Sequence, residues 1–215
     1  MPDFDKTYWE EHWAPTPANA ERDLPVHPYL PTETSQLSGG TALDAGCGTG
    51  AEAVWLAEQG WLVTGADISA TALEAAGHRA ERAGLGDRIE WVETDLTQWE
   101  PGRSWDLVVT SYAHSEIGQL LLYRQLASLV APSGTLLIVG HLHEPGTNGG
   151  SSTHGDPGHH GAHPEAASVT RDAITQMFDV PGWAIDASYE NVRAVRPGGR
   201  PVQLRDVVVR AHRNG

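Results

Sequence analysis

Leu43-Asp44-Ala45-Gly46-Cys47-Gly48-Thr49-Gly50 carries the strongest signal for the fold of this chain. A short apolar segment, 41–44, leads into it, and residues 51–59 follow with the apolar pattern of a helix. Glycines at alternate positions let the backbone turn sharply and leave no side chain between the backbone and a ligand. A strand, a glycine turn and a helix in this order are typical of a ligand site at the carboxyl end of a parallel strand.

The chain then alternates between strand and helix patterns. Apolar and β-branched segments predict further strands at 61–67, 88–94, 105–111 and 135–140. Helical spacing of apolar residues predicts helices over 51–59, 70–83 and 116–130. Strands that are separated by helices need crossover connections, and such connections make the neighbouring strands parallel.

The last third of the sequence has a different pattern. After a predicted helix at 169–178, two strand patterns at 183–195 and 202–212 are joined by the short segment 196–201. So short a connection favours an antiparallel pair, because a parallel return needs a crossover. The sequence therefore predicts a single-domain α/β fold with a doubly wound, mostly parallel, seven-stranded sheet of the Rossmann-like type and an antiparallel last strand.

Two segments lie outside this alternating pattern. Residues 1–40 are rich in proline, and the aromatic residues within 4–13 suggest a short helix, so we interpret 1–40 as an irregular N-terminal segment that forms a lid. Residues 41–215 form the ligand-binding domain. Within that domain, 144–164 are rich in glycine and histidine and are expected to form a loop.

Composition and charge narrow the class of partner. The 14 basic and 28 acidic side chains give a formal net charge of −14, and the C-terminal arginines are spread out, so a nucleic-acid partner is disfavoured. No apolar run reaches the roughly 18 residues of a membrane span, and the first residues lack a signal-peptide pattern. The single cysteine, Cys47, cannot form an internal disulfide. We expect a cytoplasmic monomer or homodimer that acts on a small molecule, away from membranes.

The glycine turn by itself fits two kinds of ligand. Gly46–Ala51 also satisfies the G-x-G-x-x-G/A pattern of dinucleotide-binding proteins, so an NAD-dependent oxidoreductase is an alternative. Asp44, two residues before the first glycine, would repel a pyrophosphate and attract an ammonium group. Asp67, at the end of the next strand, can accept hydrogen bonds from ribose hydroxyls in either case. Asp95, at the end of the third strand, is placed for the polar edge of an adenine, with Leu96 against the ring.

With these residues the chain resembles the class I S-adenosylmethionine-dependent methyltransferases. Residues 43–50 match the first motif of that family, and 63–69 match its ribose-binding strand end. Residues 105–111 and 129–136 look like its fourth strand and the turn into its fifth. The opening Tyr8-Trp9-Glu10-Glu11-His12-Trp13 is similar to that of the small tellurite-resistance and thiopurine-type methyltransferases. The resemblance implies a seven-stranded sheet with an antiparallel final strand.

S-adenosylmethionine is the cofactor that this resemblance implies. Trp13 would cover the cofactor as part of the lid or would fasten the N-terminus to the core. Cys47 is interpreted as a small residue beside the cofactor rather than a nucleophile, because no basic partner accompanies it in the sequence. The predicted cofactor-binding residues are Trp13, Asp44, Gly46, Cys47, Gly48, Gly50, Asp67, Ile68, Asp95, Leu96 and Ser111.

Histidines at the same edge of the predicted sheet are the candidates for catalysis. An alcohol, phenol or amine acceptor needs a general base, whereas a thiolate needs little help. The candidate bases or substrate contacts are His114, His141, His143, His159 and His160. The region after the fifth strand has two other interpretations, a polar lid and a site for a divalent transition metal. The candidate metal ligands are His141, His143, His154, His159, His160 and His163.

The function predicted from the sequence is transfer of the methyl group of S-adenosylmethionine to a heteroatom of a small molecule. That heteroatom is S, N, O or a metalloid. Two alternatives remain open at this point: an NAD-dependent oxidoreductase, and a non-catalytic metal-binding or sensor protein on the same fold.

Overall fold

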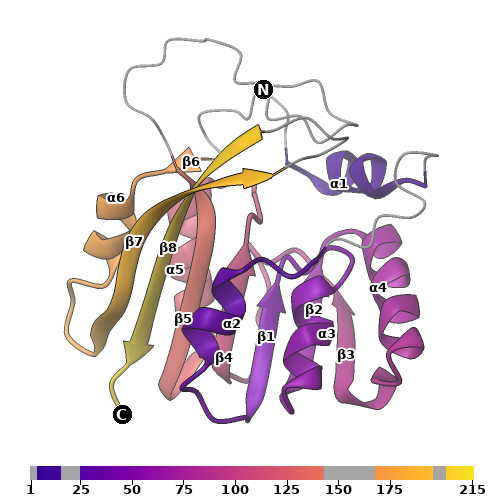
Figure 1. The fold of residues 1–215 in the computed structure, drawn as a ribbon, viewed down its shortest axis with the longest axis horizontal. Coiled ribbons are helices and arrows are strands. Elements are labelled where there is room, and N and C mark those ends of the chain that lie inside the picture. Colours follow the sequence, from indigo (N-terminus) through magenta and orange to yellow (C-terminus); the bar gives the residue numbers. More distant parts are fainter. Residues whose placement is uncertain (1–3, 16–24, 143–167, 196–201) are drawn as a thin grey trace.

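The computed structural model describes residues 4–15, 25–142, 168–195 and 202–215, which are arranged around one central sheet (Figure 1). Seven of the described strands run in the order β3-β2-β1-β4-β5-β8-β7, and the short β6 pairs with β5 beside this path. The strands are β1 (Thr41–Ala45), β2 (Leu62–Asp67), β3 (Ile89–Glu93), β4 (Trp105–Ser111), β5 (Val130–Leu142), β6 (Ser168–Val169), β7 (Trp183–Val195) and β8 (Val202–Arg213).

Strand directions confirm the predicted sheet. β1 pairs in parallel with β2 and β4, β2 with β3, and β4 with β5. β8 is antiparallel to both β5 and β7, so it is the reversed strand of the sheet. The strand order changes direction between β1 and β4, and such a switch point opens a crevice at the carboxyl ends of the two strands.

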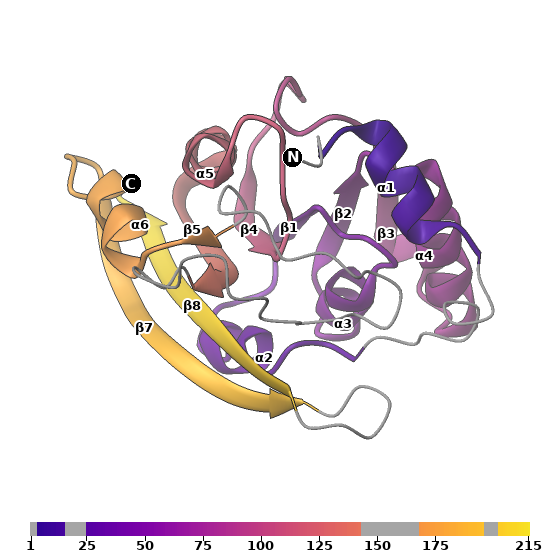
Figure 2. The same cartoon turned by 90° about the horizontal axis from the view of Figure 1, so that it is seen from above.

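Helices cover both faces of the sheet (Figures 1 and 2). α2 (Tyr29–Thr34), α3 (Ala51–Glu58) and α4 (Ala70–Arg82) pack on one face, and α5 (Gln119–Ser128) and α6 (Arg171–Met177) pack on the other. The 3₁₀ helix η1 (Gly86–Arg88) precedes β3, and α1 (Lys6–Trp13) lies at the carboxyl edge beside α4. Of the helices in the described residues, none has the length and apolar character that a membrane crossing requires.

Several element boundaries differ from those predicted, and α2 lies within the segment expected to be irregular; two of the differences have a clear local cause. β5 begins at Val130 rather than 135, because Val130 pairs with Trp105 before a register shift, and Ser133 in the shifted part has a positive φ of 62°. The helix predicted from 169 begins at Arg171. The Thr170 side chain caps it by accepting the Ala173 N–H at 3.2 Å, and the preceding β6 pairs with β5.

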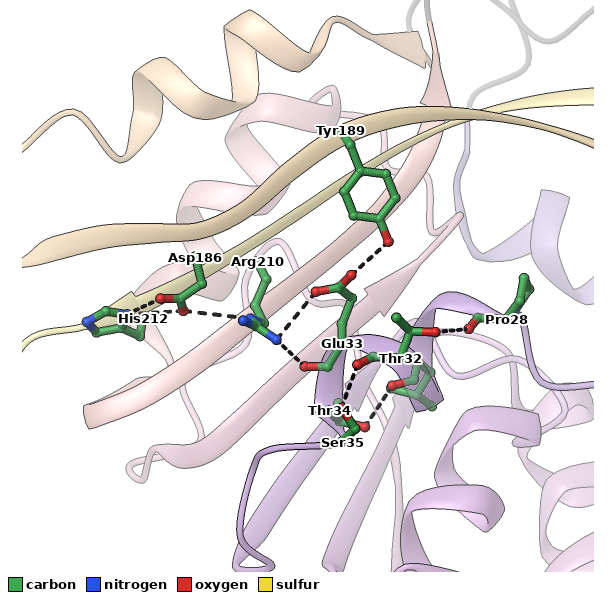
Figure 3. Close-up of polar contacts among 10 residues, drawn as sticks. Pro28, Thr32, Glu33, Thr34, Ser35, Asp186, Tyr189, Arg210 and His212 are labelled. Carbon is green, nitrogen blue, oxygen red and sulfur yellow. Dashed lines mark hydrogen bonds and ion pairs between the residues drawn. The ribbon is translucent and has the colours of Figure 1, made fainter.

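Polar contacts attach α2 to the last two strands (Figure 3). Glu33 of α2 is buried, and its carboxylate accepts the hydroxyl of Tyr189 from β7 at 2.8 Å. Arg210 of β8 donates to the backbone oxygen of Glu33, and its guanidinium lies 3.4 Å from the Glu33 carboxylate. Pairing of this kind offsets the cost of burying a carboxylate. The contacts therefore fix α2, and with it the segment 25–28 that leads into the helix.

The indole of Trp91 on β3 supports the glycine turn from the side of β2. A Cβ atom on Gly65 of β2 would lie 2.3 Å from the Trp91 ring, and one on Gly50 would lie 2.7 Å from it. The ring therefore occupies the space above two glycines that come from different parts of the fold. Close packing of this kind leaves no room for an added methyl group.

The contact between Gly65 and Trp91 can be tested by adding one methyl group. Gly65→Ala should lower the free energy of unfolding by about 1–3 kcal/mol, because the new Cβ overlaps the indole. The matched control is Gly86→Ala, where a Cβ meets nothing within 4 Å. Urea denaturation measures both variants. Equal stability of the two would contradict the packing described here, whereas Gly65→Ala combined with Trp91→Leu should regain part of the loss.

Candidate functional site

The glycine turn between β1 and α3 is held by the neighbouring strand. Gly46, Gly48 and Gly50 have φ angles of 77°, 49° and 75°, a region that favours glycine. The Gly46 and Cys47 N–H groups donate to the oxygen of Ala66 at 2.8 and 3.1 Å. The turn therefore has a fixed shape, with its ligand-facing backbone free of Cβ atoms at three positions.

Asp67 closes β2 and ties the turn to it. The side chain is 7% exposed; its Oδ2 accepts the Gly48 N–H at 2.8 Å and its Oδ1 accepts the Ser69 N–H at 2.9 Å. Burial raises the pKa of the Asp67 carboxyl, and the hydrogen bonds from Ser69 and Gly48 act in the opposite direction. A carboxylate offers about four lone-pair sites, so Asp67 keeps capacity for hydroxyl donors beyond these two bonds.

Asp44 is buried at the end of β1, with an oxygen that lacks a partner. The residue is 2% exposed, and its Oδ2 accepts no hydrogen bond from any described residue. Burial raises the pKa of Asp44 well above its usual range, and the charge of Glu52 raises it further. A buried carboxylate oxygen without a donor is costly, and a ligand ammonium group would supply both the donor and the charge. The residues at this turn therefore fit the predicted cofactor.

Helix α1 lies directly against the turn. A Cβ on Gly48 would lie 2.9 Å from the Trp13 ring, so the indole lies over the predicted cofactor turn. Glu10 accepts the N–H groups of Ala70 and Thr71 at 2.8 and 3.3 Å and thereby caps α4. Lys6 forms an ion pair with Glu93 at the end of β3. Three side chains on one helix thus attach it to three parts of the site.

The other predicted cofactor residues lie near the same edge. Asp95 accepts the N–H and the hydroxyl of Thr97 at 2.9 and 2.7 Å, so its carboxylate is part of a tight turn. Leu96 is 9% exposed and packs in the core beneath that turn. Ile68 is half-buried next to Asp67. Cys47 is buried, and burial raises the pKa of its thiol, which argues against a nucleophilic role.

His27 joins the site, although no pattern in the sequence pointed to it. Its Nδ1 accepts the Leu30 N–H at 3.3 Å, so the proton of the neutral ring lies on Nε2, which donates to the Ser111 hydroxyl at 2.8 Å. Burial lowers the pKa of His27 to about 4, and the charge of Arg193 acts in the same direction. The residue is therefore a neutral donor that orients Ser111 at the end of β4.

Two of the predicted catalytic histidines come together after β4 and β5. The rings of His114 and His141 are 5.6 Å apart between centroids, and the Tyr112 ring lies 4.8 Å from His141. A Cβ on Gly46 would lie 2.5 Å from Cβ of Ala113, so this loop borders the glycine turn. The described residues contain no group of three or more potential metal ligands. The other candidate histidines lie outside the described residues: His143, His154, His159, His160 and His163.

Comparisons with known proteins agree with this geometry. A family model described as "Methyltransferase domain" matches residues 42–134. The chain is 33% identical over 134 residues to "Probable thiol methyltransferase 2" of Arabidopsis thaliana, an alignment covering 60% of this chain and 59% of the relative. It is also 33% identical over 102 residues to "Thiocyanate methyltransferase 1" of the same plant, covering 46% of this chain and 44% of the relative. The chain thus spans less than two thirds of the length of these relatives.

A solved structure covers nearly the whole chain. The N-methyltransferase NodS from Bradyrhizobium japonicum WM9, in complex with S-adenosyl-L-homocysteine, is similar with a TM-score of 0.66 and 18% identity. The similarity covers 99% of this chain and 100% of that one. At this level of identity the likeness concerns the fold alone.

The buried neutral state of His27 predicts how stability changes with pH. In the unfolded chain His27 binds a proton below about pH 6.5, whereas in the folded chain it stays neutral down to about pH 4. The free energy of unfolding therefore falls as the pH falls from 6.5 to about 4. His27→Gln should remove about 2 kcal/mol of the difference in unfolding free energy between pH 7 and pH 5. Urea denaturation at both pH values measures it. His78→Gln, at an exposed position on α4, is the control, and an equal effect there would contradict the assignment.

The attachment of α1 through Glu10 is tested by amide hydrogen exchange. Glu10→Ala removes the acceptor for the first N–H groups of α4, so α1 should exchange faster and the start of α4 should lose protection. Glu11→Ala changes the adjacent exposed position of the same helix and should leave both segments as in the unchanged protein. If the two variants exchange alike, Glu10 does not hold the helix.

Proposed function

We propose that this chain, which belongs to the class I S-adenosylmethionine-dependent methyltransferase family, transfers the methyl group of S-adenosylmethionine to a sulfur atom of a small acceptor. The observation that carries the proposal is the glycine turn with Asp44 and Asp67 at the ends of adjacent strands. The names of the thiol and thiocyanate methyltransferases that it resembles favour sulfur over the N, O and metalloid acceptors. The NAD alternative has no such support, and Asp44 would repel a pyrophosphate.

Different residues of the site would bind different parts of the cofactor. Asp44 Oδ2 would receive the ammonium end, and Asp67 would accept from the ribose hydroxyls. Trp13 would cover the bound molecule from the side of α1. When bound, S-adenosylmethionine supplies an electrophilic methyl group on a sulfonium. Lid closure by α1 would exclude water from that methyl group, because hydration of the nucleophile slows displacement.

The acceptor would lie over the ends of β4 and β5. Tyr112, His114 and His141 gather there next to the glycine turn. For a thiol acceptor a new S–CH₃ bond forms as the S–CH₃ bond of the sulfonium breaks, S-adenosylhomocysteine is the leaving group, and the S–H proton goes to a base or to solvent. His114 or His141 would take that proton, while an acceptor that is already anionic needs none. His27 is excluded as the base, because its Nδ1 already accepts a hydrogen bond and its Nε2 carries the proton.

Methyl transfer is tested with the purified chain, S-adenosylmethionine and two acceptors, thiocyanate and a small alkyl thiol. We expect S-adenosylhomocysteine and the methylated acceptor in equal amounts, measured by mass spectrometry. Asp67→Asn should weaken S-adenosylhomocysteine binding by about tenfold or more, because a charge-assisted hydrogen bond is lost. The control is Asp179→Asn, at an exposed position after α6.

Three results would count against the proposal. Retention of S-adenosylhomocysteine without transfer to either acceptor would contradict sulfur methylation while leaving the cofactor site intact. Binding of NAD in preference to S-adenosylhomocysteine in a calorimetric titration would overturn the cofactor assignment. Equal affinities of Asp67→Asn and Asp179→Asn would remove Asp67 from the cofactor site.

A further inference from the structure

Tyr112 stands at the end of β4 in an unusual conformation. Its φ angle is 56°, in the left-handed region that tyrosine rarely adopts and that costs about 1–2 kcal/mol. Its N–H nevertheless continues the ladder by donating to the Val139 oxygen at 2.9 Å. The surroundings must hold this residue, and strain of this kind is concentrated at ligand sites.

Arg193 of β7 holds the Tyr112 side chain. Its Nη2 donates to the Tyr112 hydroxyl oxygen at 2.9 Å, and its guanidinium carbon lies 5.8 Å from the centre of the ring. Its Nε donates to Asp206 Oδ2 at 2.6 Å, and the Tyr29 hydroxyl donates to the same oxygen at 2.7 Å. The bonds from Arg193 to Tyr112 and to Asp206 use two of the five N–H donors of the guanidinium.

The side chains of Arg193 and Asp206 are buried to different extents. Asp206 is fully buried beneath the pair, whereas the Arg193 side chain is 25% exposed. The charge nearest to the acceptor edge is therefore the guanidinium, and the carboxylate lies behind it. The positive charge of Arg193 also acts at the end of β4. It lowers the pKa of His27, which contacts Ser111 on that strand.

The Tyr112 hydroxyl stays protonated. Burial raises its pKa far above the usual range for a phenol. The charge of the buried Asp206 and a hydrogen bond with it raise the same pKa further. The Tyr112 hydroxyl oxygen therefore orients the guanidinium, whose remaining N–H donors lie at the same edge, a combination that suits an anion.

The position of the pair separates it from the cofactor. The glycine turn, Asp44 and Asp67 occupy the ends of β1 and β2, whereas Tyr112 and Arg193 lie on the other side of the switch point, over β4 and β7. His141, at the end of β5, lies beside this pair, and its ring contacts those of Tyr112 and His114.

From this arrangement we propose that Tyr112 and Arg193 bind the methyl acceptor as a small anion with a soft nucleophilic atom. The inference rests on the proposed function and deepens it by naming the charge state of the acceptor. An anionic sulfur nucleophile forms the new S–CH₃ bond without losing a proton, so the pair orients it and no base is needed. For thiocyanate, the products are methyl thiocyanate and S-adenosylhomocysteine.

The experiment measures anion binding separately from turnover. Thiocyanate is titrated calorimetrically into the complex with S-adenosylhomocysteine, and dimethyl sulfide serves as an uncharged sulfur probe. Tyr112→Phe keeps the ring against His141 but loses the hydroxyl, and it should raise the thiocyanate dissociation constant by about tenfold to a hundredfold. Its affinity for dimethyl sulfide should stay within about twofold. Arg193→Lys keeps a charge for Asp206 but loses the fork, and it should have an intermediate effect.

The control is Tyr189→Phe, which removes a hydroxyl from the same strand as Arg193 at a position that binds Glu33 on α2. It should leave thiocyanate binding unchanged. An unchanged thiocyanate affinity in Tyr112→Phe overturns the inference, and so does an equal loss for both probes, which would make Tyr112 a packing residue. Absence of thiocyanate binding in the unchanged protein also overturns it, even if another sulfur acceptor is methylated. Thiocyanate that binds through Tyr112 but is not methylated supports the inference and counts against the proposed function.

Discussion

The hydrogen bond from the Gly48 N–H to the buried Asp67 carboxylate is the interaction on which the rest of the site depends. A turn with three glycines in the left-handed region loses much backbone entropy when it becomes ordered. It is held because β2 supplies the acceptors, Asp67 and the oxygen of Ala66, at the right register beside β1. The position of the proposed cofactor site is therefore decided by the pairing of β1 with β2.

Much of the region around β1, β2 and the glycine turn could be predicted from the sequence, because its signals lie close together in the chain. Asp44 closes a predicted strand and is followed by glycines and a helix, and Asp67 closes the next predicted strand just before a helix, so both belong to contiguous patterns. The reversed β8 was also predictable, since the connection 196–201 is too short for a crossover. Trp91 was less visible, because its contacts with Gly50 and Gly65 join segments that are distant in the chain.

The region proposed to bind the acceptor, at the ends of β4, β5 and β7, could not be predicted in the same way. His27 belongs to a proline-rich segment without periodicity, and it is buried by contacts with residues distant in the chain, such as Ser111 and Tyr112. Arg193 is one of several scattered arginines in the sequence, and its importance arises from Asp206 on the neighbouring strand. Such residues gain their role from tertiary packing, which leaves no pattern in a single chain. His114 and His141 were found because both follow predicted strands.

The charge of the molecule bears on how an anionic acceptor would be selected. A net charge of −14 repels anions at long range, but salt screens that field beyond about 8 Å at physiological ionic strength. Attraction must then come from donors within a few ångströms of the ligand. The charge of Arg193 is already balanced by Asp206, so Tyr112 and Arg193 add little net charge and act mainly through the direction of the guanidinium N–H groups. Directional hydrogen bonds favour a small anion that fits against these donors. They do not provide the extended positive surface that a nucleic acid requires.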